Sequence, residues 1–189
     1  MRKLKLQMQL SIDGFVAGPN HEMDWMSWNW DDEIKKYVAG ITEPVDLILL
    51  GRNLAEGFIP YWASEASKPE PMDLSFAKTM RDTSKMVFTK TLETNQWANS
   101  KLAKGDFIEE INQLKQQEGG DIIAYGGASF VASLINAGLI DEYHLFMNPV
   151  AIGKGMSIFS DLDNRLNLDL VKSISFKCGI VLLKYRPIS

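Results

Sequence analysis

The sequence predicts a single α/β domain: a mainly parallel central sheet with an antiparallel C-terminal edge and helices on both faces. Short apolar segments alternate with segments of helical periodicity through most of the chain, as is typical of parallel strands joined by crossover helices. The C-terminal part is instead rich in strand-like segments. The 189 residues suffice for one well-buried core and are few for two. We therefore expect residues 1–189 to form one domain.

The first expected element is a strand at residues 3–12, where apolar and polar side chains alternate with a period of two. Asp13 and Gly14 then turn the chain into a loop. A helix is expected from about Asp31, because acidic residues at 31–33 suit a helix start and apolar residues follow at helical spacing. The loop before this helix contains three tryptophans: Trp25, Trp28 and Trp30.

Two later apolar segments, 45–50 and 122–125, each end in a glycine turn that a helix can follow. Prolines at 60, 69 and 71 predict an irregular region after the first of these units. Asp106 resembles a helix cap, and Gly119-Gly120 would end that helix. The remaining elements are expected as a short helix, a strand and two long late strands: 73–81, 85–89, 143–152 and 173–185.

Composition and charge argue against several classes of function. A net charge of -4 without a local cluster of Lys and Arg disfavours nucleic-acid binding. One cysteine, Cys178, and two histidines, His21 and His144, cannot build a typical closed zinc site, so no metal is expected. The uncharged run 122–140 is interrupted by Gly126-Gly127 and polar side chains, so we expect no membrane span. The single cysteine and the alternating N-terminus favour a cytoplasmic location.

Three of the expected strands end in small or polar residues, and ligands of open α/β sheets collect at the carboxyl ends of strands. Glycine lets the backbone approach a phosphate, and the amides of a helix start attract anions. Arg52 and Lys90 add positive charge beside two of these turns. The glycine pair does not match the G-x-G-x-x-G fingerprint, and alone it is better explained by a tight strand-to-helix connection. Together the turns favour a phosphate-rich cofactor: Gly51-Arg52-Asn53, Thr89-Lys90-Thr91 and Gly126-Gly127-Ala128-Ser129.

Several segments resemble signature stretches of the dihydrofolate reductase-like superfamily, in the right order along nearly the whole chain. They are SIDGFVAG at 11–18, LLGRN at 49–53 and YGGA at 125–128. With GLIDE at 138–142, Pro149 and GKG at 153–155, they are most similar to the C-terminal reductase domain of the bacterial bifunctional riboflavin-biosynthesis deaminase-reductase. No H-x-E…P-C-x-x-C motif of a zinc deaminase is present, so the chain resembles the reductase part alone.

The resemblance implies an NADPH-dependent reductase of a small heterocyclic substrate, such as 5-amino-6-(5-phosphoribosylamino)uracil, in which the cofactor supplies the hydride. It also implies a homodimer, through the C-terminal strands. Ala17 would lie along the nicotinamide, and Thr89 and Lys90 would flank the adenosine 2′-phosphate. The other cofactor phosphates would contact two groups of residues: Gly51, Arg52 and Asn53, and Gly126, Gly127, Ala128 and Ser129.

Candidate residues for the substrate side are one acid and a set of aromatic rings. Dihydrofolate reductases place a carboxylate at the start of the first helix, where Asp32 or Glu33 would orient the heterocycle and relay a proton. For each acid taken alone, the favoured explanation is that it stabilises the helix start through the helix dipole. The aromatic candidates for substrate binding, with core or loop packing as the alternative, are Trp25, Trp28, Trp30, Tyr61 and Trp62.

Other functions stay open at this point. A reductase of dihydrofolate, another pterin or a carbonyl compound would keep the enzyme class and change the substrate. A non-catalytic NADPH-binding or ligand-sensing module would bind NADPH tightly without oxidising it. A structural or interaction protein with an empty cleft would bind no nucleotide at all.

Overall fold

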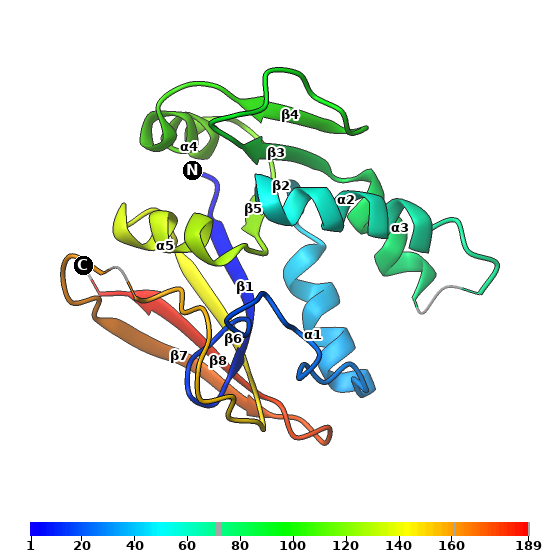
Figure 1. Ribbon diagram of the computed structural model, residues 1–189, viewed down its shortest axis with the longest axis vertical. Coiled ribbons are helices and arrows are strands. Elements are labelled where there is room, and N and C mark those ends of the chain that lie inside the picture. The colour runs from blue at the N-terminus through cyan, green and yellow to red at the C-terminus, as the bar shows by residue number, and fades with distance from the viewer. Residues whose placement is uncertain (71–72, 161, 189) are drawn as a thin grey trace.

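The computed structural model describes residues 1–70, 73–160 and 162–188, and these form an eight-stranded sheet covered by helices (Figure 1). The strand order is β4-β3-β2-β5-β1-β6-β8-β7. The strands are β1 (Leu4–Ser11), β2 (Val45–Gly51), β3 (Ser84–Phe88), β4 (Ser100–Ala103), β5 (Asp121–Ala124), β6 (Glu142–Asn148), β7 (Leu168–Ser175) and β8 (Val181–Pro187). The helices are α1 (Asp32–Thr42), α2 (Arg52–Glu65), α3 (Leu74–Asp82), α4 (Phe107–Gln116) and α5 (Ala128–Asn136).

The sheet is parallel from β4 to β6, and β8 runs antiparallel to both β6 and β7. β1 lies at its centre, with Leu6 opposite Ala124 of β5 on one side and Tyr143 of β6 on the other. This arrangement confirms the predicted fold class. It also brings the carboxyl ends of β1, β2, β3, β5 and β6 to one edge of the sheet.

Helices cover both faces of the sheet (Figure 1). On one face, Leu4, Leu6 and other apolar residues of β1 pack in a core that includes side chains of α4 and α5. On the opposite face, α2 and α3 contribute to a second cluster with Ile48 and Ile123, and α1 forms a third with Phe146. Because β1 is central, its second face is buried too, although that face is polar: Lys5, Gln7 and Ser11 are at most 8% exposed.

Aspartates begin three of the helices, as the sequence indicates for α1, α3 and α4. Asp31 accepts a hydrogen bond from the Ile34 amide at 3.0 Å, and Asp73 accepts one from the Phe76 amide at 2.9 Å. Asp106 accepts from the amides of Ile108 and Glu109, each at 3.0 Å. Each aspartate satisfies amides that the first helical turn leaves without a partner.

The prediction of an irregular region from Pro60 onwards is wrong in its first part. α2 continues through Pro60 to Glu65. Pro60 is exposed, while Ala55 and Ile59 on the inner side of the helix are buried in the core. Packing of that inner face, together with contacts to α3, outweighs the backbone hydrogen bond that proline removes. Pro69 lies in a bend, and Pro71 lies outside the described residues.

The late strands also differ from their predicted bounds. Residues 173–185 form a hairpin instead of one strand: β7 ends at Ser175, and Gly179 turns the chain with a φ of +92° before β8 begins. β7 starts earlier than predicted, at Leu168, and β6 ends at Asn148 instead of residue 152. Pro149 follows directly and has no amide hydrogen to continue the ladder.

The uncharged run 122–140 contains β5, the glycine turn and α5. Within the described part of the chain, no helix has both the length and the apolar character needed to cross a membrane.

Candidate functional site

The carboxyl ends of β2 and β5 place two helix starts side by side. The strands pair with Leu49 opposite Ala124, and the Gly51 amide donates to the Gly126 carbonyl at 3.4 Å. α2 begins directly after Gly51, and α5 begins directly after Gly127. Because both helices point their amino ends towards this edge, their positive dipole ends lie next to each other. We call the turns Gly51-Arg52-Asn53 and Gly126-Gly127-Ala128-Ser129 the glycine cradle.

The glycine cradle has the properties of an anion site. Unlike the aspartate-capped helices, α2 and α5 have glycine at the cap and, among the described residues, no side-chain cap hydrogen bond. Gly126 has a φ of +136°, which favours glycine, and it joins Gly127 through a cis peptide bond. A β-carbon built on Gly127 would have no described atom within 4 Å outside its chain neighbours. Free helix-start amides beside open space fit a phosphate group.

Arg52 joins the glycine cradle to the turn after β3. The Arg52 Nη1 donates a 2.7 Å hydrogen bond to Thr91 Oγ1 in that turn, and its Nε donates to Glu56 at 2.9 Å. Thr89 Oγ1 accepts from the amides of Thr91 and Leu92, which holds this turn in shape. Lys90, between Thr89 and Thr91, is exposed. Arg52 of the cradle and Lys90 of the Thr89-Lys90-Thr91 turn are therefore two cations on turns joined by a hydrogen bond.

The loop after β1 is fastened to the segment that follows β6. Met156 donates its amide to the Ala17 carbonyl at 2.8 Å, and Gly155 approaches the same carbonyl so closely that a β-carbon would collide with it. The Asp13 carboxylate accepts from the amides of Ile152 and Gly153. Residues 153–155 therefore support the Ala17 loop: close packing requires glycine at position 155, and a φ of +75° favours it at position 153.

The helix-start acids divide into one bonded and two exposed side chains. Asp31 caps α1 and also accepts from the Cys178 amide at 3.2 Å, and the backbone hydrogen bond from Ile34 is the main cause that lowers its pKa. Asp32 and Glu33 lie exposed in the first turn of α1. Their position suits the helix dipole, and a catalytic role for either acid stays a prediction.

The predicted aromatic residues fall into two groups. Trp30 lies half-buried on Phe146 of β6, with ring centroids 6.4 Å apart, and donates its Nε1 hydrogen to the Ser27 carbonyl. Trp28, 5.5 Å from Trp30, is 57% exposed. Trp25 donates to the carbonyl of Glu22 within its own loop. Among the described residues, Trp30 is the one tryptophan of this group whose ring packs on a ring of the sheet.

The second aromatic group lies on α2. Trp62 packs against Phe58 and against Phe76 of α3, with ring centroids 6.1 and 5.2 Å apart. Phe58 in turn stacks on Tyr125 at 5.5 Å, immediately before the glycine pair. Tyr61 is 47% exposed and touches only Trp62 among the described aromatic rings. The structure therefore connects Trp62, through Phe58, to Tyr125, the residue that precedes the cradle's glycine pair.

Four polar residues of the central strands and their ends were not predicted from the sequence to be site residues: Gln7, Gln9, Tyr125 and Asn148. Asn148 is fully buried; its Nδ2 donates to Gln9 Oε1 at 2.7 Å, and its Oδ1 accepts from the Ser27 amide at 3.1 Å. It thereby ties the loop before α1 to the two central strands. The signal available in the sequence was the polar alternation of residues 3–12, which acquires this meaning only if the strand is central.

His144 belongs to a separate buried network under α1. It is 1% exposed, and its Nδ1 lies 2.7 Å from the hydroxyl of Tyr37. Burial is the main cause that lowers its pKa to about 4, so it is neutral at pH 7. Across the described residues, no group of three or more His, Cys, Asp or Glu side chains is arranged to hold a metal ion.

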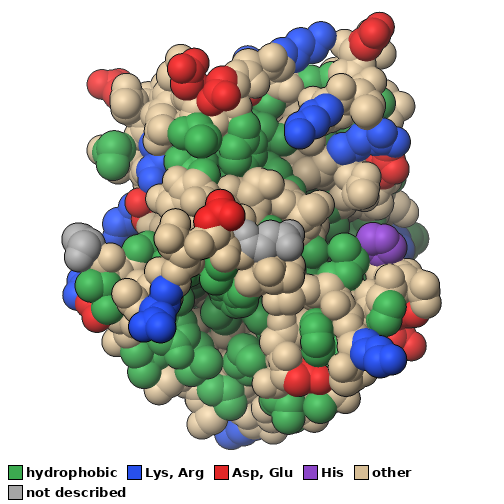
Figure 2. Space-filling model, turned by 60° about the vertical axis from the view of Figure 1, so that its left-hand side comes forward, with side chains coloured by type: hydrophobic (Ala, Val, Ile, Leu, Met, Phe, Trp, Pro, Cys, Tyr) green, Lys and Arg blue, Asp and Glu red, His purple; other side chains and the backbone are tan. Residues whose placement is uncertain are grey.

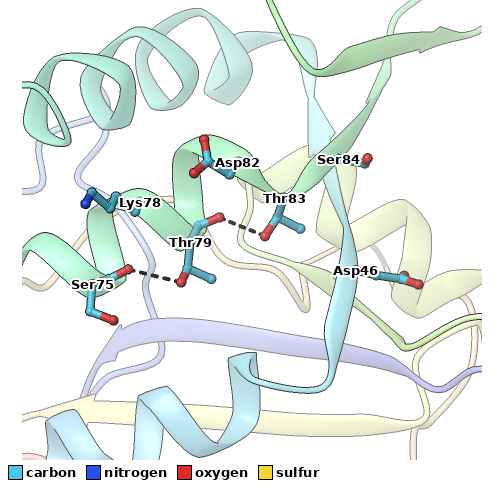
Figure 3. A pocket seen from close by; sticks show the side chains of 7 residues that line it. All are labelled: Asp46, Ser75, Lys78, Thr79, Asp82, Thr83 and Ser84. Atoms are coloured by element: carbon cyan, nitrogen blue, oxygen red, sulfur yellow. Dashed lines mark hydrogen bonds between the residues drawn. The ribbon is translucent and has the colours of Figure 1, made fainter.

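A surface hollow lies at the other end of the sheet, where β2 and β3 begin (Figure 3). Two of its hydroxyls, on Thr79 and Thr83, already donate to carbonyls one helical turn earlier. The hollow is lined by Asp46, Ser75, Lys78, Thr79, Asp82, Thr83 and Ser84. Since Gly51 and Phe88 end these strands at the opposite edge, the hollow is not part of the glycine cradle.

The fold and the cradle define an α/β protein of the dihydrofolate reductase type. Dihydrofolate reductase from Enterococcus faecalis, solved as a complex with NADP(H), superposes with a TM-score of 0.63 at 15% identity, over 99% of this chain and 97% of that one. The deaminase/5-amino-6-(5-phosphoribosylamino)uracil reductase of Thermotoga maritima gives 0.69 at 17% identity, over 99% of this chain and 57% of that one. These likenesses confirm the fold.

More narrowly, the chain belongs to the RibD C-terminal domain family, whose model matches residues 2–182. A relative, the YyaP protein of Bacillus subtilis (strain 168), is 33% identical over 187 residues, which span 97% of this chain and 94% of the relative. These matches confirm the family that was predicted from the sequence.

Proposed function

We propose that this protein is an NADPH-dependent reductase of a small heterocyclic substrate. The observation that carries the proposal is the glycine cradle, where two adjacent helices begin with glycine and leave their first amides free for an anion. Membership of the RibD C-terminal domain family supports it, because the Thermotoga protein of similar fold is named as a uracil reductase. The residues present thus fit the diphosphate of a dinucleotide.

The preference for NADPH over NADH depends on the turn after β3. Lys90 is exposed there, and Thr91 already bonds to the Arg52 guanidinium. A phosphate on the adenosine ribose would meet both cations, whereas a free hydroxyl would not gain from their charge. We therefore expect Lys90 and Arg52 to select the phosphorylated cofactor.

NADPH, when bound, supplies a hydride to an electrophilic carbon of the substrate. The chain's own contribution is to hold both partners and exclude water. The Ala17 loop is fixed by its pairing with Met156, and the Ser27 segment is fixed by Asn148. Addition of the hydride to a C=N or C=O bond, with one proton from solvent or a neighbouring acid, gives the amine or alcohol.

We propose an aminopyrimidine or pterin as the heterocycle, by analogy with the name of the Thermotoga enzyme. To test this, purified protein with NADPH is offered aminopyrimidine, pterin and aldehyde substrates while the absorbance of NADPH is followed. Oxidation dependent on the protein and on one heterocycle is the expected result. Tight NADPH binding without oxidation by any of them would favour a ligand-sensing module, and no NADPH binding would exclude the proposal.

A further inference from the structure

The polar face of β1 contains two kinds of side chain. Lys5 has partners: its Nζ forms an ion pair with Asp121 at 2.7 Å and donates to the Ile41 carbonyl. Ser11 is bonded to Phe15. By contrast, three of the four buried polar atoms without a hydrogen-bond partner among the described residues belong to β1 or to the residue after β5: Gln7 Oε1, Gln9 Nε2 and Tyr125 Oη. The fourth, Glu110 Oε2, lies apart from them on α4.

The three unpartnered atoms belong to neighbouring positions. β1 pairs with β5 up to Leu6 opposite Ala124, so the next residues, Gln7 and Tyr125, continue side by side on the same face as Lys5 and Ile123. Gln9 follows on that face, opposite Phe146 of β6. Tyr125 directly precedes the glycine pair. The three residues therefore occupy neighbouring positions on the face covered by α1 and α2, where β5 leads into the glycine cradle.

Leaving these atoms unpartnered destabilises the folded chain, because a buried donor or acceptor has lost its water without replacement. Leu in place of Gln7 and Phe in place of Tyr125 would keep nearly the same shape without that cost. A side-chain amide that is 8% exposed, in the central strand of a sheet, is thus explained by a partner that arrives from outside.

We propose that Gln7, Gln9 and Tyr125 recognise the polar edge of the substrate, and that this edge is an uncharged lactam, with neighbouring N–H and C=O groups. The inference rests on the proposed function, since it assigns the substrate side of the same site. Gln7 Oε1 accepts a hydrogen bond from the ring N–H, and Gln9 Nε2 donates one to the ring carbonyl. The Tyr125 hydroxyl can take either role.

The orientation of Gln9 follows from its neighbour. Its Oε1 accepts from Asn148 Nδ2 at 2.7 Å, so its amide nitrogen is the end left free for a carbonyl. Charge also favours a neutral ring: Lys5 is neutralised by Asp121, and the Asp31 carboxylate already caps α1. Asp32 and Glu33 are exposed, so a cationic ring buried against these amides would have no buried counter-charge.

The test uses Gln7→Leu and Tyr125→Phe, with Gln113→Leu, an exposed glutamine of α4, as the matched control. Lumazine serves as the neutral lactam probe and 2,4-diaminopteridine as the probe with a basic ring. Binding of each is measured by calorimetry at saturating NADP⁺, which cannot reduce the probe, and the Tm of the free protein is measured separately. We expect lumazine to bind wild type more tightly than 2,4-diaminopteridine, and each test variant to weaken lumazine binding about tenfold.

The same variants should raise the Tm of the free protein by about 2–4 °C, because each removes an unsatisfied buried group, while Gln113→Leu leaves both measurements unchanged. Unchanged lumazine affinity in both test variants, tighter binding of 2,4-diaminopteridine, or a lowered Tm would overturn the inference. NADPH titration of every variant separates the two proposals. Loss of NADPH binding by wild type defeats the proposed function, whereas intact NADPH binding with no lumazine binding defeats only this inference.

Discussion

Gly51 and Phe130 lie in close contact where α2 and α5 begin: a β-carbon on Gly51 would be 2.8 Å from the β-carbon of Phe130. Phe130 in turn stacks on Phe88 of β3 at 5.3 Å, so it cannot move away freely. Gly127, only one turn of chain from Phe130, has open space around it instead. Gly51 is therefore explained by close packing against Phe130, whereas Gly127 leaves room for a ligand.

This difference predicts opposite effects of the same substitution. Gly51→Ala should lower the free energy of unfolding by about 1–3 kcal/mol, because overpacking forces Phe130 from its site. Gly127→Ala should change stability by about 1 kcal/mol or less and still weaken NADPH binding at least tenfold, since the methyl group occupies the space of a phosphate. Thermal unfolding and NADPH titration of both variants check this. Normal NADPH affinity in Gly127→Ala would contradict the cradle.

Burial of His144 makes stability depend on pH. Its pKa is lowered from 6.5 to about 4 in the folded chain, mainly by burial, so only the unfolded chain takes up its proton between those values. Stability is fully present above pH 6.5 and is lost as pH falls, by about 1.4 kcal/mol per unit and about 3 kcal/mol in all. The groups that face it are Tyr37, Glu142, Lys184 and Lys5.

The variant His144→Gln should lose most of this pH dependence, measured by thermal unfolding between pH 7 and pH 4.5. Glu142 does not mimic the effect, because its pKa is lowered to about 2 and its own contribution is lost only below about pH 4.5. An equally steep loss of stability in the variant would show that His144 is not the group responsible.

The exposed acids of α1 should act on stability more than on catalysis. Asp32→Asn and Glu33→Gln each remove a negative charge from the positive end of the helix, which should cost about 0.3–1 kcal/mol. Once a substrate has been identified, the kcat of each variant should stay within about twofold of the wild-type value. A fall in kcat of about a hundredfold or more with an altered pH profile would instead establish the acid as a proton donor.

The C-terminal strands are where we propose that two copies of this chain form a dimer. β7 is an edge strand, and its Leu170 and Val171 are 55% and 49% exposed. Figure 2, which brings the C-terminal side forward, shows hydrophobic side chains gathered on the lower part of this face. The double variant Leu170→Asp, Val171→Asp should be monomeric by light scattering, whereas Ile108→Asp, at another exposed apolar residue, should stay dimeric. A monomeric wild type would contradict the proposal.

The parts of the fold that local signals control were predictable from the sequence. Aspartate caps located the starts of α1, α3 and α4, and glycine turns located the ends of β2 and β5. β4 (Ser100–Ala103) was missed because the strand has only four residues, two of them polar, and only pairing with β3 makes it a strand. The prediction at Pro60 was wrong for a similar reason, since tertiary packing of α2 overrides the tendency of proline to end a helix.

The polar side of the candidate site could not be read from the sequence. Gln7 and Gln9 alternate with apolar residues as on any half-exposed strand, and nothing local shows that β1 has neighbours on both sides. Asn148 and Tyr125 acquire their roles only when β6 and β5 pair with β1. These residues are joined by long-range pairing, which no short segment encodes.

The central claim is that the glycine cradle and the turn at Lys90 bind NADPH, and the most direct measurement is titration with NADPH and with NADH by quenching of tryptophan fluorescence. Wild type should bind NADPH at least tenfold more tightly than NADH. Lys90→Ala should remove most of that preference, while Lys78→Ala, an exposed lysine of α3 beside the hollow at the opposite edge, should keep it. Binding of neither nucleotide, or equal binding of both by wild type, would contradict the account.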